Sequence, residues 1–393
     1  MRSADAAPLG RYLRLAVLAG AALLCACSGN GKDTSEPPAE LQKFDAKLDV
    51  HKIWSANVGG GSERLRLGLK PSTNGINVFA AGHDGKVVAL DATTGDRVWR
   101  VDTKLALSAG PGYDAGLLAV GTTDGDLLAL DAETGQERWR RQVGSEVMAP
   151  PAIGSGVVVL RTVDGRLRGF SAMDGSELWT VEQSKPALIL RGDTAPQISS
   201  DTVVAGFDNG HIGAYRITDG QTVWELPLAN PTGRTELDRL VDISAGLVVV
   251  ANDVYAVGYQ GRAVGVDLNT GLLLWQQDMS SFSGLDVDAD NVYVTNDIGS
   301  VIALSRRGGV PVWRQDALRL RDLTAPTRFK DALVVGDFEG YLHWLDITDG
   351  SFLARVRAAH GRITSAPLVV RDSIVVQSED GSVSAYTTAE PES

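Results

Sequence analysis

One phrase of sixteen residues recurs along this chain and constrains its fold more than any other feature. Its clearest copies, residues 84–99 and 124–139, align residue for residue. Each copy opens with Asp-Gly, continues through an apolar run that ends in Ala-Leu-Asp-Ala, turns at Thr-Gly and closes on tryptophan. Glycine supplies the positive φ of tight hairpin turns, and runs of this kind between turn signals are typical of strands. Each phrase therefore predicts two antiparallel strands.

The phrase occurs eight times, and its opening glycines lie 38 to 51 residues apart. They are Gly85, Gly125, Gly165, Gly210, Gly261, Gly299, Gly340 and Gly381. An apolar run precedes these glycines, with another short strand before it, which makes about four strands per repeat. Repeats of this length built from strands are typical of propellers. We therefore predict an all-β protein, an eight-bladed β-propeller with four-stranded antiparallel blades.

The tryptophans indicate how the ring closes. Six phrases end in tryptophan: Trp99, Trp139, Trp179, Trp224, Trp275 and Trp313. Trp54 precedes the first phrase and no tryptophan follows the last, so the N-terminal strand is predicted to complete the eighth blade and remove the exposed sheet edge. The seventh phrase has Ala354 at this position and Trp344 on the preceding strand, where we expect compensatory packing. We expect the indoles to fill the wedges between blades.

The first thirty residues resemble an export signal. Arginines precede an apolar run at 15–24 that is too short to span a bilayer. Leu-Cys-Ala-Cys follows and resembles the bacterial lipobox, which makes Cys27 the expected lipidated residue. We therefore predict a signal peptide (1–26), a flexible lipidated tether (27–43) rich in Ser, Pro and Glu, the propeller (44–388) and a C-terminal tail (389–393). In the lipoproteins that this segment resembles, an aspartate after the cysteine tends to retain the protein at the inner membrane, so the resemblance with Ser28 at this place implies the outer membrane.

Composition and motifs argue against several functions. The net charge of -12 disfavours a nucleic-acid partner. Both cysteines lie before residue 28, the five histidines are scattered, and no nucleophile elbow, dinucleotide fingerprint or Walker loop occurs. Asp286, Asp288 and Asp290 resemble the start of a calcium loop, but Asn291 stands where such a loop needs glycine. We predict no catalytic residue, cofactor or metal site.

Two consecutive connections are long and suggest where a partner binds. Thirty residues separate Trp179 from Asn209 and 36 separate Trp224 from Gln260, against 23 to 25 in the shorter connections. The first connection contains Leu188, Leu190 and Arg191, and apolar residues beside arginine are the mix expected of an interface anchor. The alternative is that the leucines are strand core.

The repeat's Ala-Leu-Asp-Ala-x-Thr-Gly-x-x-x-Trp wording resembles the tryptophan motif of pyrroloquinoline-quinone propellers over about residues 50–388. The segments 188–192, 236–242 and 336–344 look like those of the BamB family, lipoproteins of the outer-membrane β-barrel assembly machinery. The last two segments are not part of the generic repeat.

The resemblance implies a non-enzymatic scaffold in the outer membrane that faces the periplasm. Its expected partners are the POTRA domains of BamA and other subunits of the complex, with nascent outer-membrane β-barrel proteins as a further candidate. The family's contact residues match Leu188, Leu190, Arg191 and Asp242, whereas Ser244 occupies a place that is often acidic. The alternative is a pyrroloquinoline-quinone-dependent dehydrogenase, which the cysteine-free propeller disfavours because such enzymes carry an adjacent cysteine pair.

Overall fold

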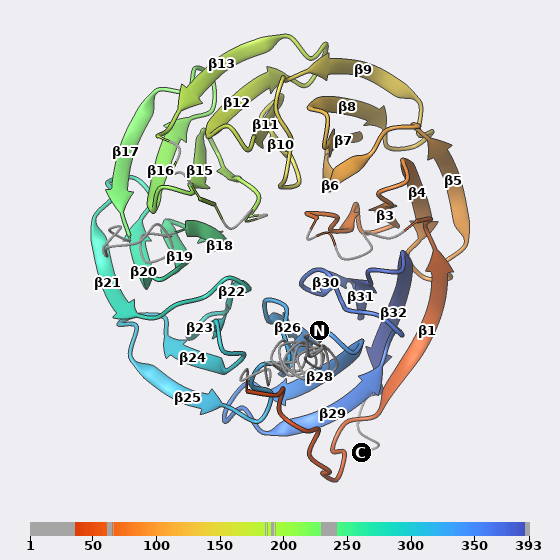
Figure 1. Ribbon diagram of the computed structural model, residues 1–393, viewed down its shortest axis with the longest axis vertical. Helices are drawn as coiled ribbons and strands as arrows, with labels where there is room; N and C mark the ends of the chain where they lie inside the picture. The colour runs from red at the N-terminus through yellow and green to blue at the C-terminus, as the bar shows by residue number, and fades with distance from the viewer. Residues whose placement is uncertain are drawn as a thin grey trace, which may run out of the picture. The chain divides into compact units, whose positions relative to one another are not determined.

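The computed structural model describes residues 36–60, 65, 67–184, 186, 188, 189, 192, 194–228 and 242–389. Residues 38–393 form one compact unit and residues 1–37 a separate one, of which only Glu36 and Pro37 are described. The larger unit is a ring of eight four-stranded antiparallel sheets (Figure 1). This arrangement confirms the predicted all-β, eight-bladed propeller. The described part of the chain contains no helix that could cross a bilayer.

In the first seven blades the strands run from the innermost to the outermost in chain order. Blade one contains β2 (Ser72–Thr73), β3 (Asn77–Ala81), β4 (Lys86–Asp91) and β5 (Arg97–Asp102). Blade two contains β6 (Leu107–Asp114), β7 (Leu117–Thr122), β8 (Asp126–Asp131) and β9 (Glu137–Gln142). Blade three contains β10 (Ala152–Gly154), β11 (Val157–Arg161), β12 (Arg166–Ser171) and β13 (Glu177–Glu182). Blade four contains β14 (Gln197–Ser199), β15 (Thr202–Gly206), β16 (His211–Arg216) and β17 (Thr222–Pro227).

The second half of the ring continues the pattern. Blade five contains β18 (Asp242–Val250), β19 (Asp253–Tyr259), β20 (Arg262–Asp267) and β21 (Leu273–Asp278). Blade six contains β22 (Gly284–Val287), β23 (Asn291–Thr295), β24 (Val301–Ser305) and β25 (Pro311–Gln315). Blade seven contains β26 (Thr327–Phe329), β27 (Ala332–Gly336), β28 (Tyr341–Asp346) and β29 (Phe352–Arg357). Blade eight contains β30 (Leu368–Val370), β31 (Ser373–Gln377), β32 (Ser382–Thr388) and β1 (Val50–Asn57).

Blade eight is shared between the two ends of the propeller. β1 pairs with β32, with Ser55 opposite Ser384 and Val50 opposite Thr388. The N-terminal strand thus becomes the outermost strand of the last blade, as the position of Trp54 predicts. The edge of β32 is covered by this pairing, and the ring is closed by hydrogen bonds rather than by packing alone.

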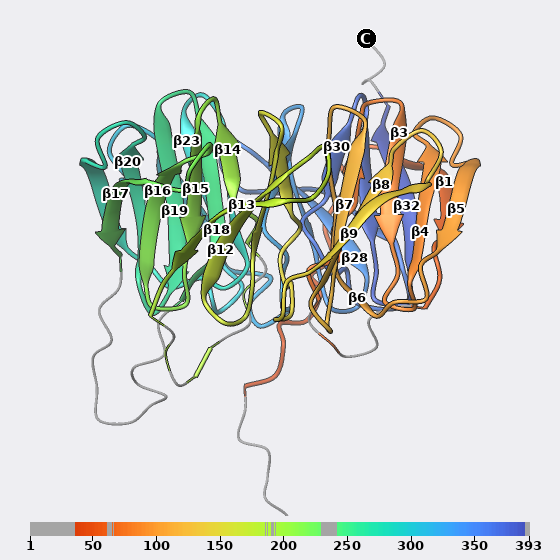
Figure 2. The same cartoon turned by 90° about the horizontal axis from the view of Figure 1, so that it is seen from above.

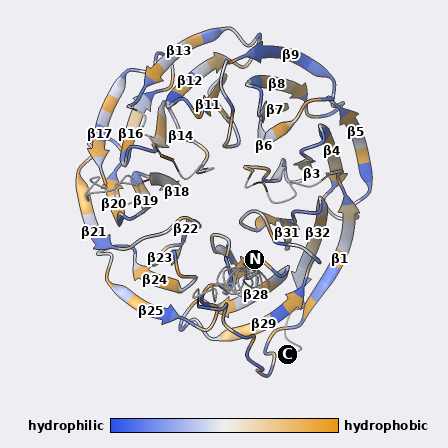
Figure 3. Cartoon of the chain, in the orientation of Figure 1, coloured by the Kyte–Doolittle hydropathy of each residue, from blue (hydrophilic) through white to orange (hydrophobic). Residues whose placement is uncertain are grey.

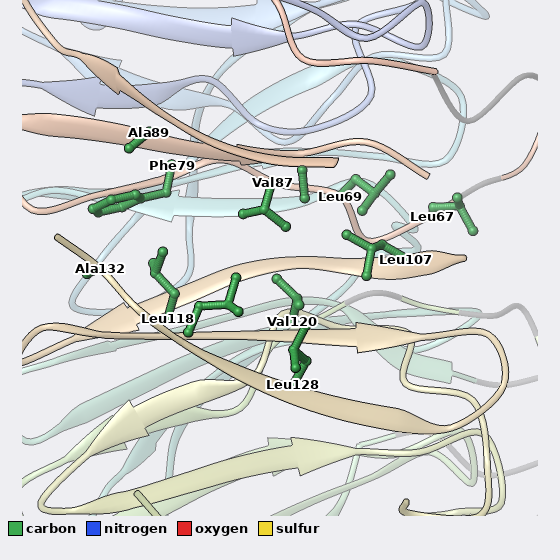
Figure 4. Packing of buried hydrophobic residues seen from close by; sticks show 12 residues of the cluster. Leu67, Leu69, Phe79, Val87, Ala89, Leu107, Leu118, Val120, Leu128 and Ala132 are labelled. Carbon is green, nitrogen blue, oxygen red and sulfur yellow. The ribbon is translucent and has the colours of Figure 1, made fainter. Parts of the chain in front are cut away.

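Apolar side chains fill the space between neighbouring blades. One cluster joins Phe79 and Val87 of blade one to Leu107, Leu118 and Leu128 of blade two (Figure 4). A corresponding cluster lies at each of the other seven blade junctions. The core therefore consists of eight wedge-shaped clusters arranged in a ring, and two neighbouring blades form each cluster.

Each tryptophan of the repeat reaches across such a junction. The Trp99 indole N–H donates to the Ala132 carbonyl at 3.0 Å, in the turn between β8 and β9 of the next blade. Gly135 closes that turn at φ +74°, and a Cβ there would lie 2.7 Å from the Trp99 ring. The Thr-Gly turn needs glycine both for its backbone and for the indole that covers it. Six other tryptophans make the equivalent bond: Trp54, Trp139, Trp179, Trp224, Trp275 and Trp313.

The junction between blades seven and eight is different. The strands β32 and β1 are joined by no turn, because the propeller begins and ends there, so a tryptophan of blade seven would have no Thr-Gly turn to cover. Ala354 stands at this position and pairs directly with Trp344, which is 1% exposed. Leu48 and Val50 pack against the same cluster. The compensatory packing expected for the seventh phrase is thus confirmed.

Residues 39–49 lie against blade seven before β1 begins. The amides of Lys47 and Leu48 donate to the Leu353 carbonyl at 2.8 and 3.2 Å, and Ala39 donates to the Arg319 carbonyl at 2.9 Å. Composition assigns 39–43 to a flexible tether, because the segment is polar. In the structure, backbone hydrogen bonds attach this segment to the propeller. Composition does not reveal such bonds, because it describes only the side chains.

Candidate partner-binding face

The topology sorts the connections onto two faces. The Asp-Gly turns between second and third strands lie on the same face as the connections from one blade to the next, because antiparallel strands alternate in direction. We call this the loop face. The Thr-Gly turns lie on the opposite face. β13 and β17, after which the two long connections begin, both end on the loop face, at the lower edge of Figure 2.

The structure describes only some of the predicted contact residues. Leu188 is described and 43% exposed in the connection between β13 and β14, so it is not strand core. Leu190 and Arg191 lie outside the described residues, as does Cys27. Asp242 is the first residue of β18 and its backbone pairs with Tyr259, but its side chain, like that of Ser244, is outside the description. The ends of both connections therefore lie on adjacent blades of one face.

Arg161 fixes the base of the first long connection. This residue ends β11 and is 5% exposed. Its guanidinium donates to the Gly192 carbonyl at 2.9 Å and to the Gly206 carbonyl at 2.8 Å. The Asp208 carboxylate lies 3.3 Å away. A rigid arginine fork thus ties the connection that carries Leu188 to the strands of blades three and four. Arg161 could not be recognised from the sequence, because it lies in an apolar strand outside the repeated phrase.

Blade seven holds a second buried charged group. Arg321 donates to Asp337 at 2.8 Å and also pairs with Glu339. His343 and Asp337 are fully buried, with 3.0 Å between Nε2 and the carboxylate, and Arg355 Nε approaches His343 Nδ1 at 3.2 Å. A neutral imidazole with its proton on Nε2 satisfies both contacts.

The electrostatics of this group agree with that protonation. Burial lowers the pKa of His343 by more than Asp337 raises it, so the ring is neutral near pH 7. Burial alone would raise the pKa of Asp337, but hydrogen bonds from His343 and the Tyr341 amide, with the charge of Arg321, hold it below its usual value. The group is therefore an ionised Asp–Arg pair with a neutral histidine.

The polar residues considered for metal binding have other roles. The Asp288 carboxylate accepts hydrogen bonds from the Asp290 and Asn291 amides and from the Tyr293 hydroxyl. Asp286 accepts from the Arg328 amide at 2.6 Å. Within the described ranges no group of three or more His, Cys, Asp or Glu side chains could hold a metal ion. Asp288 thus caps the turn between β22 and β23, and Asp286 joins β22 to β26 of the next blade.

The outermost strands form a surface separate from the loop face. β9 is largely hydrophilic, whereas β21 begins with hydrophobic residues and ends with hydrophilic ones (Figure 3). Leu272, Leu273 and Leu274 are 67, 43 and 51% exposed, and Val310 and Val312 of the next blade are also exposed. Leu188 lies in the connection between β13 and β14 and not on this rim.

The fold and the loop face together define an eight-bladed propeller of PQQ-like repeats with two long connections on one face. A family model described as "Outer membrane protein assembly factor BamB" matches residues 83–315 and 299–391. The chain belongs to this family.

Individual relatives support this family membership. The chain is 44% identical over 377 residues to the outer membrane protein assembly factor BamB of Pseudomonas aeruginosa, covering 96% of this chain and 99% of that one. It is 49% identical over 346 residues to the BamB of Marinobacter adhaerens, covering 88% and 89%. The crystal structure of BamB from Moraxella catarrhalis superimposes with a TM-score of 0.79 at 27% identity, covering 86% of this chain and 100% of that one.

The dehydrogenase alternative rests on the fold alone. Quinohemoprotein alcohol dehydrogenase from Comamonas testosteroni matches with a TM-score of 0.68 but only 13% identity, covering 88% of this chain and 78% of that one. The curated relatives are named as assembly factors and not as enzymes. These names support the prediction that the chain is not an enzyme.

Proposed function

We propose that this protein is a scaffold lipoprotein of the outer-membrane β-barrel assembly complex that binds the POTRA domains of BamA and assists the folding and insertion of β-barrel proteins. The exposed Leu188 on the loop face is the observation that carries the proposal, together with membership of the BamB family. Exposed apolar residues beside an arginine are typical of the anchors of protein interfaces. The proposed contact residues are Leu188, Leu190, Arg191 and Asp242.

Co-purification with BamA from detergent extracts tests this surface. The double variant Leu188→Ala with Arg191→Glu should lose at least nine-tenths of the BamA that the unchanged protein retains. Leu178→Ala with Arg100→Glu is a matched control, because it makes the same two substitutions at exposed positions of β13 and β5. Undiminished co-purification by the first variant would show that BamA binds elsewhere.

The lipid anchor is a separate part of the proposal. Lipidation at Cys27 would attach the chain to the outer membrane with the propeller in the periplasm, and the lipobox-like Leu-Cys-Ala-Cys supports it. Cys27→Ala should abolish labelling by radioactive palmitate and release the protein from the membrane fraction. Palmitate labelling that persists in Cys27→Ala would place the lipid on another residue.

A further role in contacting nascent β-barrel proteins is part of the same proposal. Photocrosslinking from position 190 identifies the partner directly. A crosslink to BamA supports the docking surface, whereas crosslinks only to barrel substrates would assign this connection to substrate contact.

A further inference from the structure

The N-terminal segment 39–49 makes specific contacts with the propeller. Its first contacts are reciprocal: the Ala39 amide donates to the Arg319 carbonyl, and Arg321 donates to the Ala39 carbonyl at 3.0 Å. Leu41 packs against the core between blades six and seven. Arg321 is 4% exposed with the segment in place, and Asp337 and Glu339 pair with its guanidinium.

A second arginine holds the middle of the segment. Arg355 donates to the Gln42 carbonyl at 3.0 Å. Phe44 stacks on Phe352 with 5.1 Å between ring centroids, and the Arg355 guanidinium lies over both rings. Stacking and cation–π contacts of this kind stabilise the docked segment.

The buried group of blade seven positions both arginines. Asp337 and Glu339 orient Arg321, while His343 contacts the Nε of Arg355 and leaves its Nη1 for the Gln42 carbonyl. The backbone bonds of Lys47 and Leu48 to Leu353 then lead the chain into β1. We call residues 39–49, held in this way, the clasp.

The clasp begins on the loop face. Arg319 and Arg321 belong to the connection between β25 and β26, and Asp337 and Glu339 to the Asp-Gly-type turn between β27 and β28, and both lie on that face. Figure 2 shows the red N-terminal segment at the lower edge, from which the long connections also leave. β1, in contrast, lies on the outer rim.

The position of the clasp changes the reach of a lipid anchor at Cys27. Twelve residues separate Cys27 from Ala39, a span of at most ~40 Å when fully extended and about 20 Å on average as a flexible coil. Without the clasp the free chain would run to Val50 on the rim and could extend to ~80 Å. The clasp therefore halves the reach and moves the attachment point from the rim to the loop face.

We infer that the clasp is an orienting device, which holds the loop face toward the membrane to which the lipid attaches the protein. The inference rests on the proposed anchor at Cys27. It assigns Arg321 and Arg355 the role of binding the chain's own N-terminal segment, and it brings the partner-binding connections to the membrane-facing side of the propeller.

Limited trypsin digestion of the mature full-length protein tests whether the segment is docked. Lys43 and Lys47 are exposed side chains on a backbone that the clasp holds, so cleavage after them should be slow. Leu41→Ser with Phe44→Ser should accelerate this cleavage at least tenfold and leave the urea midpoint of the propeller nearly unchanged. Gln42→Ser with Ala46→Ser is the matched control at exposed positions and should cleave at the unchanged rate. Equal cleavage of the unchanged protein and the Leu41 and Phe44 variant would refute docking.

Fluorescence quenching on vesicles tests the orientation. Single cysteines replace Asp124 on the loop face or Glu133 on the opposite face, both exposed in blade two, and carry a fluorophore. With a quencher on the lipid headgroups, the lipid-anchored protein should show at least twofold stronger quenching at 124 than at 133, and the Leu41 and Phe44 variant should lose this difference. Equal quenching at both positions in the unchanged protein would refute the orientation.

The two experiments separate this inference from the proposed anchor. A mature protein that carries no lipid and does not bind vesicles would refute the anchor at Cys27 and the orientation with it. The trypsin result on the same protein would still decide whether the clasp exists.

Discussion

At the scale of single residues, the repeat joins a glycine turn of one blade to a tryptophan of the blade before it. Gly135 has φ +74° and lies under the Trp99 ring, whereas Gly116 has φ +81° with no atom within 4 Å of its would-be Cβ. Alanine at either position bears the cost of a left-handed backbone, roughly 1–2 kcal/mol. Only at Gly135 does the new methyl group also displace the indole.

Comparison of Gly135→Ala with Gly116→Ala isolates that displacement. We expect Gly135→Ala to lower the free energy of unfolding by about 1–3 kcal/mol more than Gly116→Ala, because the junction becomes overpacked. Urea unfolding monitored by circular dichroism measures both. Equal losses would mean that the indole shifts at no cost.

Asp131, the aspartate of the Ala-Leu-Asp-Ala phrase, makes the turn sensitive to acid. Its carboxylate accepts hydrogen bonds from Arg138, from the Thr134 hydroxyl and amide and from the Glu133 amide. The Arg138 bond, with these others, lowers the pKa of Asp131 to about 2 from 3.8. A lowered pKa in the folded state stabilises the fold above the unfolded value, and this stabilisation disappears as pH falls from 3.8 toward 2.

The variant Asp131→Asn should therefore differ from the unchanged protein most above pH 4. The difference in unfolding free energy should shrink as pH falls below 4, as measured by urea unfolding between pH 3 and 6. Asp124→Asn, an equal change of charge at an exposed turn of the same blade, is the control. A difference that does not vary with pH would show that the Asp131 charge is not what stabilises the turn.

At the scale of elements, Arg161 joins strand β11 to the connection that carries Leu188. Removing one member of a buried ion pair costs about 3–5 kcal/mol, because the other charge stays buried, whereas replacing both by apolar residues is often neutral. Arg161→Met should therefore lower the unfolding free energy by about 3 kcal/mol. Arg161→Met with Asp208→Leu should recover most of it.

The double variant separates folding from binding. Methionine at position 161 cannot donate to the Gly192 carbonyl, so the connection between β13 and β14 loses its attachment to β11. BamA co-purification should therefore fall several-fold. Full co-purification by the double variant would show that Arg161 serves stability alone.

The sequence predicts the strands and their pairing better than it predicts the contacts that fix the loops and the N-terminal segment. The period of the repeat predicts the strands that contain the repeated phrase. The position of Trp54 before the first phrase predicts the pairing of β1 with β32. The bonds of Arg161 and the docking of residues 39–49 could not be predicted, since both use backbone carbonyls as acceptors, and every residue type supplies those. Leu188 was predicted as a contact residue from the length and composition of its connection and from the resemblance to the BamB family, and its exposure removes the alternative of strand core.

At the scale of the whole molecule, closure is what makes eight separate sheets one cooperative unit. Each core cluster belongs to two neighbouring blades, so every blade depends on both neighbours. A chain that starts at Val58 lacks β1 and exposes both the edge of β32 and the cluster that contained Trp54.

We expect that shortened chain to unfold at a lower urea concentration and in more than one step. Tryptophan fluorescence and circular dichroism should give different midpoints, because the blades beside the gap unfold before those opposite it. One coincident transition at the unchanged midpoint would mean that the other blades are sufficient for cooperativity.

The place where the N-terminal segment meets blade seven also determines how a mechanical load enters the ring. A pull from the N-terminal side reaches the bonds of Ala39 and Gln42 to arginines before it reaches β1. β1 pairs with β32 along its length and would be peeled away one bond at a time by a force applied at Val50. The clasp transfers that force to the guanidinium groups of Arg321 and Arg355, so the pairing of β1 with β32 is shielded from tension on the tether.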